Sequence, residues 1–224
     1  MKRLLKSSLF FFFSFFVGRA GRRALARWVF HAEIDPSASI GVCFIDTEEL
    51  RMGPRSQLGH LTIMRNLEKV VLEDDGILGT FNWVFGARGT THFRKERERS
   101  SSLLIRCGAS VTSRHILDCT DTIEIGRFAT VAGFRSQILT HAIDVRRNRQ
   151  SCAPVTIGAY SFIGTGTILL KGAKFPKASI LSAGSVYSER DQPDFTLYSG
   201  VPAGPVRDLP KTSEYMNREK PDVE

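Results

Sequence analysis

Large apolar side chains recur every six residues along much of the chain. Between residues 157 and 186 the sequence divides into five blocks of six, which read IGAYSF, IGTGTI, LLKGAK, FPKASI and LSAGSV. The first position of every block is large and apolar, and the fifth is small: Ile157, Ile163, Leu169, Phe175 and Leu181 in the first set, Ser161, Thr167, Ala173, Ser179 and Ser185 in the second. Neither the 3.6-residue period of a helix nor the alternation of a simple strand predicts this spacing. The period indicates an internal repeat.

The same pattern occurs upstream with more exceptions. Further blocks begin at Ile34, Ile40, Met52, Leu58, Leu72, Leu78, Ile105, Ile125 and Val131. Six residues make a short strand and a turn, with position one pointing inward and a small residue at the corner. Three such sides close a triangular coil, and stacked coils bury a continuous core. The sequence therefore predicts a solenoid of short strands, although His115 and Arg135 occupy fifth positions without being small.

Two segments, 81–104 and 142–154, break the six-residue register. Loops that project from a rigid scaffold often carry binding and catalytic residues. His141 lies directly before the second segment, and Asp144 follows three residues later. A residue between a stiff strand and a loop is both fixed and accessible, which suits a catalytic base.

Residues 1–33 have a different composition from the repeat. An apolar run, Leu9 to Val17, is flanked on both sides by Lys and Arg. This run is too short for a membrane-spanning helix, which needs about 20 residues, and no small-x-small cleavage site follows it. We expect a helix, for which two alternatives stay open. It lies on a membrane face through residues 1–20, or it packs on its own domain or on a neighbouring subunit.

Charge and cysteine content narrow the class of protein. Lys and Arg number 31 and Asp and Glu 23, so the formal net charge is +8. The basic residues are divided among the N-terminus, 93–101 and 144–150, a distribution that does not favour nucleic acid as a partner. The four cysteines form no C-x-x-C pair and none lies near a histidine at zinc spacing. Reduced thiols in a cytosolic protein without a metal site are expected.

The repeat consensus is Leu, Ile or Val, then Gly, two free positions, a small residue and one more position. Over residues 34–208 it resembles the hexapeptide-repeat acyltransferases. The stretches ILTHAID, at 138–144, and SAGSVYSE with LYSGVPAGPVR, within 182–207, are similar to segments of the galactoside, maltose and polysaccharide O-acetyltransferase type. The resemblance implies an all-β fold, a left-handed parallel β-helix with an N-terminal helix and projecting loops.

Three regions are expected from this resemblance and from the changes in composition. Residues 1–33 form the N-terminal apolar and basic segment, and 34–187 form the β-helix acyltransferase domain. Residues 188–224 form an extension that completes the coenzyme site and ends in a polar tail.

The resemblance also implies a reaction. An acetyl group would pass directly from acetyl-CoA to a hydroxyl of a sugar or of a cell-surface polysaccharide precursor, with His141 as general base. Histidine has a reference pKa near 6.5 and can act as a neutral base. Asp144 or a backbone carbonyl would hold its other ring nitrogen, and a backbone N–H would stabilise the oxyanion. Neither a covalent acyl-enzyme nor a metal is required.

Other site residues follow from position in the matching segments. Thr165, Ala183, Ser188 and Arg207 would contact coenzyme A, with the Arg207 guanidinium on a phosphate. Glu189 and Gly204 depart from the family pattern, which carries a basic residue at both positions. His115 with Asp118 would bind the acceptor; the alternative for His115 is a structural role.

Partners and competing functions complete the expectations. The family is trimeric, with active sites between subunits, so a homotrimer in the cytoplasm or on the inner face of the membrane is expected. One alternative is a non-enzymatic β-helix that serves as a binding scaffold, which the substitutions at Glu189 and Gly204 favour. Another is a zinc-dependent hydratase of the γ-carbonic-anhydrase type. That class needs three histidines, two of them close in sequence, whereas His115 and His141 are far apart.

Overall fold

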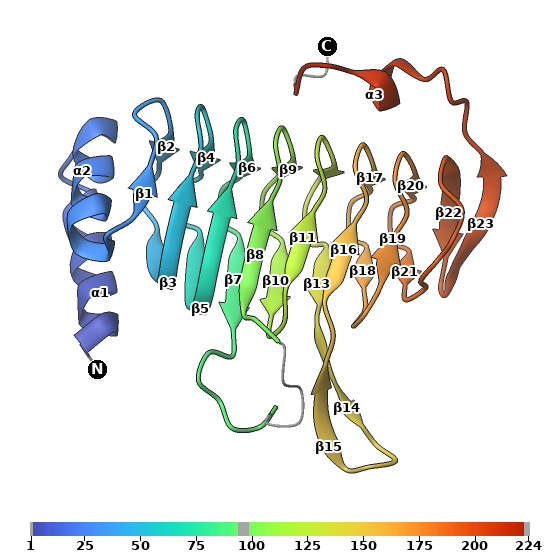
Figure 1. Ribbon diagram of the computed structural model, residues 1–224, viewed down its shortest axis with the longest axis horizontal. Helices are drawn as coiled ribbons and strands as arrows, with labels where there is room; N and C mark the ends of the chain where they lie inside the picture. Colours follow the sequence, from blue (N-terminus) through green and yellow to red (C-terminus); the bar gives the residue numbers. More distant parts are fainter. Residues whose placement is uncertain (1, 94–98, 222–224) are drawn as a thin grey trace.

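The chain forms a triangular prism of stacked parallel strands, closed at its N-terminal end by two helices (Figure 1). The computed structural model describes residues 2–93 and 99–221. Each coil contributes one short strand to each of three faces. The fold is a left-handed parallel β-helix, which confirms the predicted class.

The strands divide among the three faces according to their pairing. Face 1 contains β1 (Glu33–Ile34), β8 (Ser102–Ile105), β11 (Ile123–Ile125), β16 (Val155–Ile157) and β19 (Lys174–Phe175). Face 2 contains β2 (Ser39–Ile40), β4 (Gln57–Leu58), β6 (Ile77–Leu78), β9 (Ser110–Val111), β12 (Thr130–Val131), β17 (Phe162–Ile163), β20 (Ile180–Leu181), β22 (Thr196–Gly200) and the antiparallel β23 (Ala203–Asp208). Face 3 contains β7 (Trp83–Gly86), β10 (Ile116–Cys119), β13 (Gln137–Leu139), β18 (Ile168–Leu169) and β21 (Val186–Tyr187).

Two longer strands join face 3 to face 1. β3 (Phe44–Met52) and β5 (Ile63–Leu72) pair with face 3 through their first residues and with face 1 through their last. Asn66 lies at this bend with φ 59°, a left-handed conformation that Asn tolerates better than most residues. Its backbone N–H donates to Asp46 and its amide nitrogen to the carbonyl of Gly86.

The repeat positions have the predicted burial. All five apolar residues at position one between 157 and 186 are at most 2% exposed, and the small residues at position five are at most 1% exposed. Glycine has a separate role at the second position of the first two blocks. A methyl group on Gly158 would lie 2.4 Å from the backbone nitrogen of Lys177, and one on Gly164 would lie 2.6 Å from that of Ala183. These glycines are required because the next coil approaches closely, and neither has a positive φ.

Two helices cover the N-terminal end of the prism. They are α1 (Lys2–Ser14) and α2 (Arg19–Phe30). Many N–H groups of a coil donate to carbonyls of the following coil, as from Ser39 to Ser56, and the corresponding carbonyls of the first coil have no preceding coil to accept from. The α2 arginines Arg22, Arg23 and Arg27 donate to the carbonyls of Ile40, Ala38 and Ile34, respectively. The Ser7 hydroxyl of α1 donates to the carbonyl of Ile45.

One side of these helices therefore packs on the protein's own domain, which is one of the two alternatives expected for residues 1–33. Phe10 is fully buried and its ring packs against Phe30 at 5.2 Å between centroids. The opposite side of α1 is apolar and exposed, through Leu5, Leu9, Phe12 and Phe13, and Phe16 in the turn that follows the helix is exposed as well. Within residues 2–93 and 99–221, no helix is long and apolar enough to cross a membrane.

The C-terminal end is closed by aromatic side chains. Phe175, Tyr187 and Tyr198 pack edge to face, with centroids 4.9 to 5.7 Å apart. The chain then runs back along the prism to the short helix α3 (Glu214–Asn217). Tyr215 donates to Thr130 there, and the Arg218 guanidinium lies 4.0 Å from the Tyr215 ring centroid. The tail from 211 to 221 is thus attached to the β-helix.

Candidate active site

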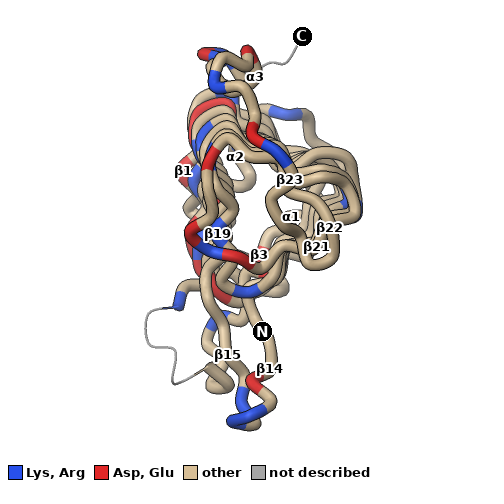
Figure 2. The backbone as a smooth tube through the Cα atoms, turned by 90° about the vertical axis from the view of Figure 1, so that its right-hand side faces the viewer, with Lys and Arg blue, Asp and Glu red and all other residues tan. Residues whose placement is uncertain are grey.

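Both interruptions of the repeat leave the prism at one corner, between face 3 and face 1. A loop, 87–101, connects β7 to β8, and a hairpin of β14 (His141–Asp144) and β15 (Arg149–Cys152) connects β13 to β16. Figure 1 shows the described start of the loop and the hairpin projecting in the same direction, and Figure 2 shows the hairpin below the prism. The first interruption is shorter than predicted, because β7 and β8 occupy both ends of segment 81–104. One uninterrupted coil, with the turn from β10 to β11, lies between them.

The end of β10 carries Asp118, and the hairpin begins with His141. Asp118 on β10 is in register with Leu139 on β13, and His141 follows two residues later. Residues two apart along an extended chain point to the same side, so His141 faces Asp118. The Asp118 carboxylate is fully buried, and its Oδ2 contacts Nδ1 of His141. Its Oδ1 accepts from the backbone N–H and the hydroxyl of Thr120, at 3.0 and 2.7 Å.

This arrangement selects one form of the imidazole. A carboxylate only accepts hydrogen bonds, so the neutral ring of His141 carries its proton on Nδ1. Its Nε2 then has a free lone pair. The His141 side chain is 40% exposed, whereas the Asp118 side chain has no exposed surface. A buried acid thus orients a ring whose reactive edge is open, which is the arrangement of a general base.

The loop from β7 supplies one wall beside His141. The Phe93 ring is 8% exposed and meets the His141 ring edge to face, with centroids 6.2 Å apart. Arg99 lies over Phe93 at 5.3 Å and donates to the carbonyls of Thr120 and Ala87 at 3.0 and 2.8 Å. Arg99 therefore anchors this end of the loop to the corner that holds Asp118.

Asp144, expected as the partner of His141, is directed elsewhere. It pairs with Arg149 across the hairpin, and its carboxylate accepts the backbone N–H of Arg147 at 3.2 Å. A guanidinium nitrogen of Arg147 lies 3.7 Å from its second oxygen. The structure thus brings Asp118, rather than Asp144, to the imidazole.

His115 does not lie where an acceptor could reach it. It belongs to a column of buried side chains at the corner between face 2 and face 3, formed by Thr62, Asn82, His115, Ser136, Thr167 and Ser185. Its backbone N–H donates to Asn82 Oδ1 at 2.9 Å, and its Nδ1 accepts the N–H of Ser136 at 3.2 Å. Burial lowers the pKa of His115 to about 4, so the ring is neutral. The structure corrects the expectation that His115 and Asp118 bind the acceptor together. His115 is 1% exposed, and its hydrogen bonds join neighbouring side chains of the buried column.

The residues expected to contact coenzyme A lie on the C-terminal half of the prism. Thr165 and Ala183 belong to successive coils at one corner and are both exposed. The carbonyl of Thr165 accepts the N–H of Gly184, in the coil that follows, at 3.0 Å. Ser188 is exposed after β21, and its hydroxyl donates to Glu189 at 3.2 Å. Arg207 is exposed on β23, opposite Leu197.

Three residues near His141 were not singled out from the sequence: Phe93, Arg99 and Thr120. The segment LDCTD, at 117–121, could have indicated Thr120, because it places an acid and a hydroxyl at a corner one coil before His141. Nothing in the irregular segment around Phe93 indicated a contact with the hairpin.

The cysteine at this corner is not arranged for nucleophilic chemistry. Burial raises the pKa of the Cys119 thiol well above its usual value, so that thiol is not poised as a nucleophile. Across the described ranges 2–93 and 99–221, no group of three or more His, Cys, Asp or Glu side chains is arranged to hold a metal ion.

Known proteins resemble this chain mainly in fold. No family model matches it. A 72-residue stretch is 38% identical to YJL218W of Saccharomyces cerevisiae, which carries a provisional assignment as an acetyltransferase; the match covers 31% of this chain and 36% of that protein. The chain thus matches about a third of the length of this curated relative.

Solved structures match over more of the length. The polysialic acid O-acetyltransferase OatWY has a TM-score of 0.55 and 15% identity, over 82% of this chain and 90% of that one. The hexapeptide-repeat acetyltransferase VCA0836 from Vibrio cholerae O1 biovar eltor, complexed with acetyl coenzyme A, has a TM-score of 0.48 and 17% identity, over 94% and 88%. A mutant of AntD, an N-acyltransferase from Bacillus cereus in complex with dTDP and coenzyme A, has a TM-score of 0.49 and 15% identity, over 87% and 93%.

These structural neighbours are hexapeptide-repeat acyltransferases, and the match to OatWY shows that this chain shares their β-helix fold. At such low identity the likeness extends to the fold and not to individual residues.

Proposed function

We propose that the chain is an acetyl-CoA-dependent O-acyltransferase in which His141 is the general base and Asp118 orients it. The observation that carries the proposal is the buried Asp118 carboxylate on Nδ1 of His141, which leaves Nε2 at an open edge. The shared fold with acetyltransferases supports the reaction class. A sugar or glycan hydroxyl is the proposed acceptor, by analogy of fold with a polysialic acid O-acetyltransferase.

The proposed reaction needs a single transfer step. Nε2 of His141 takes the proton of the acceptor hydroxyl as that oxygen attacks the thioester carbonyl of acetyl-CoA. A backbone N–H at a coil corner stabilises the tetrahedral oxyanion. The intermediate collapses to the acetyl ester, and the departing thiolate receives the proton from the imidazolium. Asp118 stabilises that imidazolium through Nδ1–H without itself becoming protonated.

Coenzyme A would lie along the C-terminal coils. Thr165 and Ala183 offer an exposed backbone corner to the pantetheine arm, and Ser188 and Arg207 would contact the nucleotide end. Glu189 and Gly204 supply no positive charge there. The exposed guanidinium of Arg207 would meet a phosphate.

Assembly as a homotrimer is part of the proposal. The outer surface of face 3 exposes apolar side chains on its N-terminal coils, including Leu61, Ile63, Phe81 and Trp83. With Leu4 and Phe11 of α1, four of them line an apolar groove of about 630 Å³. Apolar surface on this scale is typical of a surface that another chain covers.

Contact with a membrane through α1 is a further part of the proposal. Phe12, Phe13 and Phe16 are between 50% and 73% exposed, and Trp28 of α2 is 78% exposed. An amphipathic helix with an aromatic outer side is suited to the interface of a bilayer.

The proposed function is tested with the variant His141→Ala. Loss of the base should lower acetyl transfer from acetyl-CoA to glycan acceptors by a factor of about a hundred or more. Calorimetry should show that acetyl-CoA still binds, and sedimentation should give the mass of a trimer for both proteins. Near-normal turnover of His141→Ala would refute the assignment of the base, and a monomer mass for the wild type would refute the assembly.

A further inference from the structure

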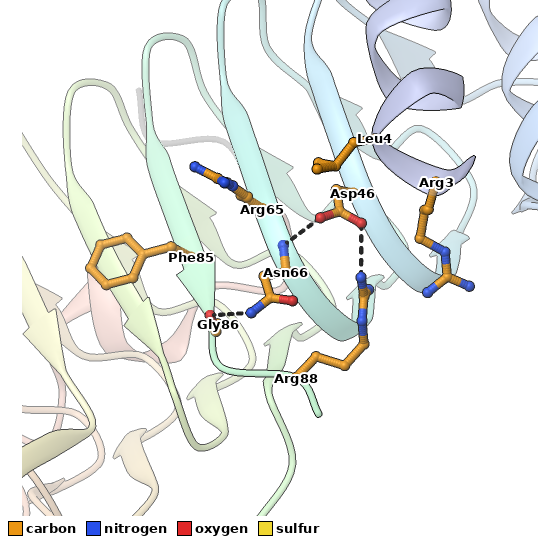
Figure 3. A pocket seen from close by; sticks show the side chains of 8 residues that line it. All are labelled: Arg3, Leu4, Asp46, Arg65, Asn66, Phe85, Gly86 and Arg88. Atoms are coloured by element: carbon orange, nitrogen blue, oxygen red, sulfur yellow. Dashed lines mark hydrogen bonds and ion pairs between the residues drawn. The ribbon is translucent and has the colours of Figure 1, made fainter. Parts of the chain in front are cut away.

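A pocket lined by three arginines lies at the same corner as His141, nearer the N-terminal end of the prism. Its volume is about 530 Å³. The lining residues come from α1, β3, β5, β7 and the root of the 87–101 loop: Arg3, Leu4, Asp46, Arg65, Asn66, Phe85, Gly86 and Arg88 (Figure 3). None of these residues has a role in the reaction described above.

Two of the three guanidinium groups are already paired. Arg88 donates to Asp46 at 3.0 Å and to the carbonyl of Leu67 at 2.6 Å, and it lies 3.6 Å from Glu48. Asp46 is nearly buried, and its second oxygen accepts the N–H of Asn66. Arg3 donates to Glu48 at 2.8 Å. These contacts fix the base of the pocket and neutralise two positive charges.

Arg65 is the positive charge that remains. It is exposed on β5, and within the described ranges no hydrogen bond or ion pair engages its guanidinium. Figure 3 shows Arg65 and Arg3 on opposite sides of Asp46. The first turn of α1 also contains no acidic residue, so the side chains of that turn do not offset the positive N-terminal end of the helix dipole. The pocket therefore has an excess of positive potential and an unengaged guanidinium fork.

The pocket and the base belong to one row across face 3. Arg65 is in register with Phe85, Phe85 with Asp118, and Asp118 with Leu139. Adjacent strands are about 4.8 Å apart, so the backbones of Arg65 and Asp118 are separated by about 10 Å. Phe85, which is 37% exposed, lies between them. Along this row a guanidinium is followed by an aromatic ring and then by the imidazole that Asp118 holds.

We propose that this pocket binds an oxyanion carried by the acceptor, a carboxylate or a phosphate, while the acceptor hydroxyl lies at His141. The inference rests on the proposed function and adds the substrate class, an anionic saccharide. Arg65 would bind both oxygens of the group through its planar fork. Phe85 would contact the apolar face of the intervening sugar. Arg65 is thus assigned as a specificity-determining residue.

Binding without acetyl-CoA tests the pocket separately from the reaction. Trigalacturonate, as a carboxylate probe, and glucose 1-phosphate, as a phosphate probe, are titrated by calorimetry into the full chain at low salt, with maltotriose as the neutral reference. At least one anionic probe should bind more tightly than maltotriose. Arg65→Met should weaken that binding about tenfold or more, and Arg65→Lys should retain part of it. The stronger of the two probes identifies the oxyanion.

The matched control is Arg19→Met on α2. Arg19 is exposed, and no hydrogen bond or ion pair engages it within the described ranges, so this variant removes the same charge far from the row and should bind like wild type. Because no hydrogen bond or ion pair engages the Arg65 guanidinium within the described ranges, its variants should keep the wild-type melting temperature. If neither anionic probe binds, or if Arg65→Met binds as wild type does, the inference is wrong while the transfer reaction can still stand. If Arg19→Met weakened binding equally, the effect would come from net charge alone and the proposed site would be wrong.

Discussion

His115 and His141 both lie at corners of the prism, and their surroundings give them different properties. His115 is enclosed in the column between face 2 and face 3, where both ring nitrogens have partners within the protein. His141 has one nitrogen on Asp118 and 40% of its side chain exposed. Sequence position alone did not separate the two, since each is followed three residues later by an aspartate. What separates them is which side of the coil each ring faces.

A pH dependence follows for His115. Its pKa is lowered from 6.5 to about 4 by burial, so between these values the unfolded chain binds a proton that the folded chain does not. The stability that the neutral, buried His115 ring contributes is therefore fully present above about pH 6.5 and is lost as the pH falls toward 4. We expect the free energy of unfolding, measured with urea, to fall between pH 7 and pH 5 by less in His115→Asn than in wild type. Equal losses would show that His115 titrates normally in the folded protein.

Regular elements of this fold were predictable where the repeat is strict. The five blocks from 157 to 186 form strands with the expected burial, because a large residue at position one and a small one at position five leave one way to pack. The long strands β3 and β5 were not predictable. Their residues 47–50 and 67–70 continue from one face to the next without a block boundary. The ends of the 87–101 loop were missed because Trp83–Gly86 and Ser102–Ile105 pair with neighbouring coils without repeat glycines.

The exposed side of α1 and the turn that follows it give a prediction at this scale. The double variant Phe12→Ser, Phe16→Ser removes two side chains that are 58% and 73% exposed, so the prism should keep its stability. Flotation with vesicles of phosphatidylglycerol and phosphatidylcholine should recover wild type and lose most of this variant, since interfacial binding scales with buried apolar area. Phe134→Ser, which alters an aromatic residue 55% exposed on the prism, is the control. If wild type fails to float, or if the double variant floats equally well, membrane contact through α1 is excluded.

At the scale of the whole molecule, the prism places separate functions along one corner. The N-terminal helices close the first coil, the arginine-lined pocket follows, and then come the loop, Asp118 and the hairpin with His141 (Figure 1). The order of these parts follows the sequence because each coil stacks on the one before. Contacts between coils depend on register, and the pairing of Asp118 with Leu139 spans a coil of 21 residues, which is longer than three blocks of six. For this reason the sequence indicated His141 but not its partner.

The central claim is that Asp118 holds His141 in its catalytic orientation. Its most direct test compares kcat for acetyl transfer in Asp118→Asn and Asp144→Asn. In Asp118→Asn the neutral amide can no longer stabilise the imidazolium with a negative charge and can hold the wrong tautomer, so kcat should fall by about two orders of magnitude or more. Asp144→Asn removes a carboxylate that contacts Arg147 on the hairpin, so kcat should stay within about twofold of wild type. A large loss in Asp144→Asn together with near-normal turnover in Asp118→Asn would contradict the account.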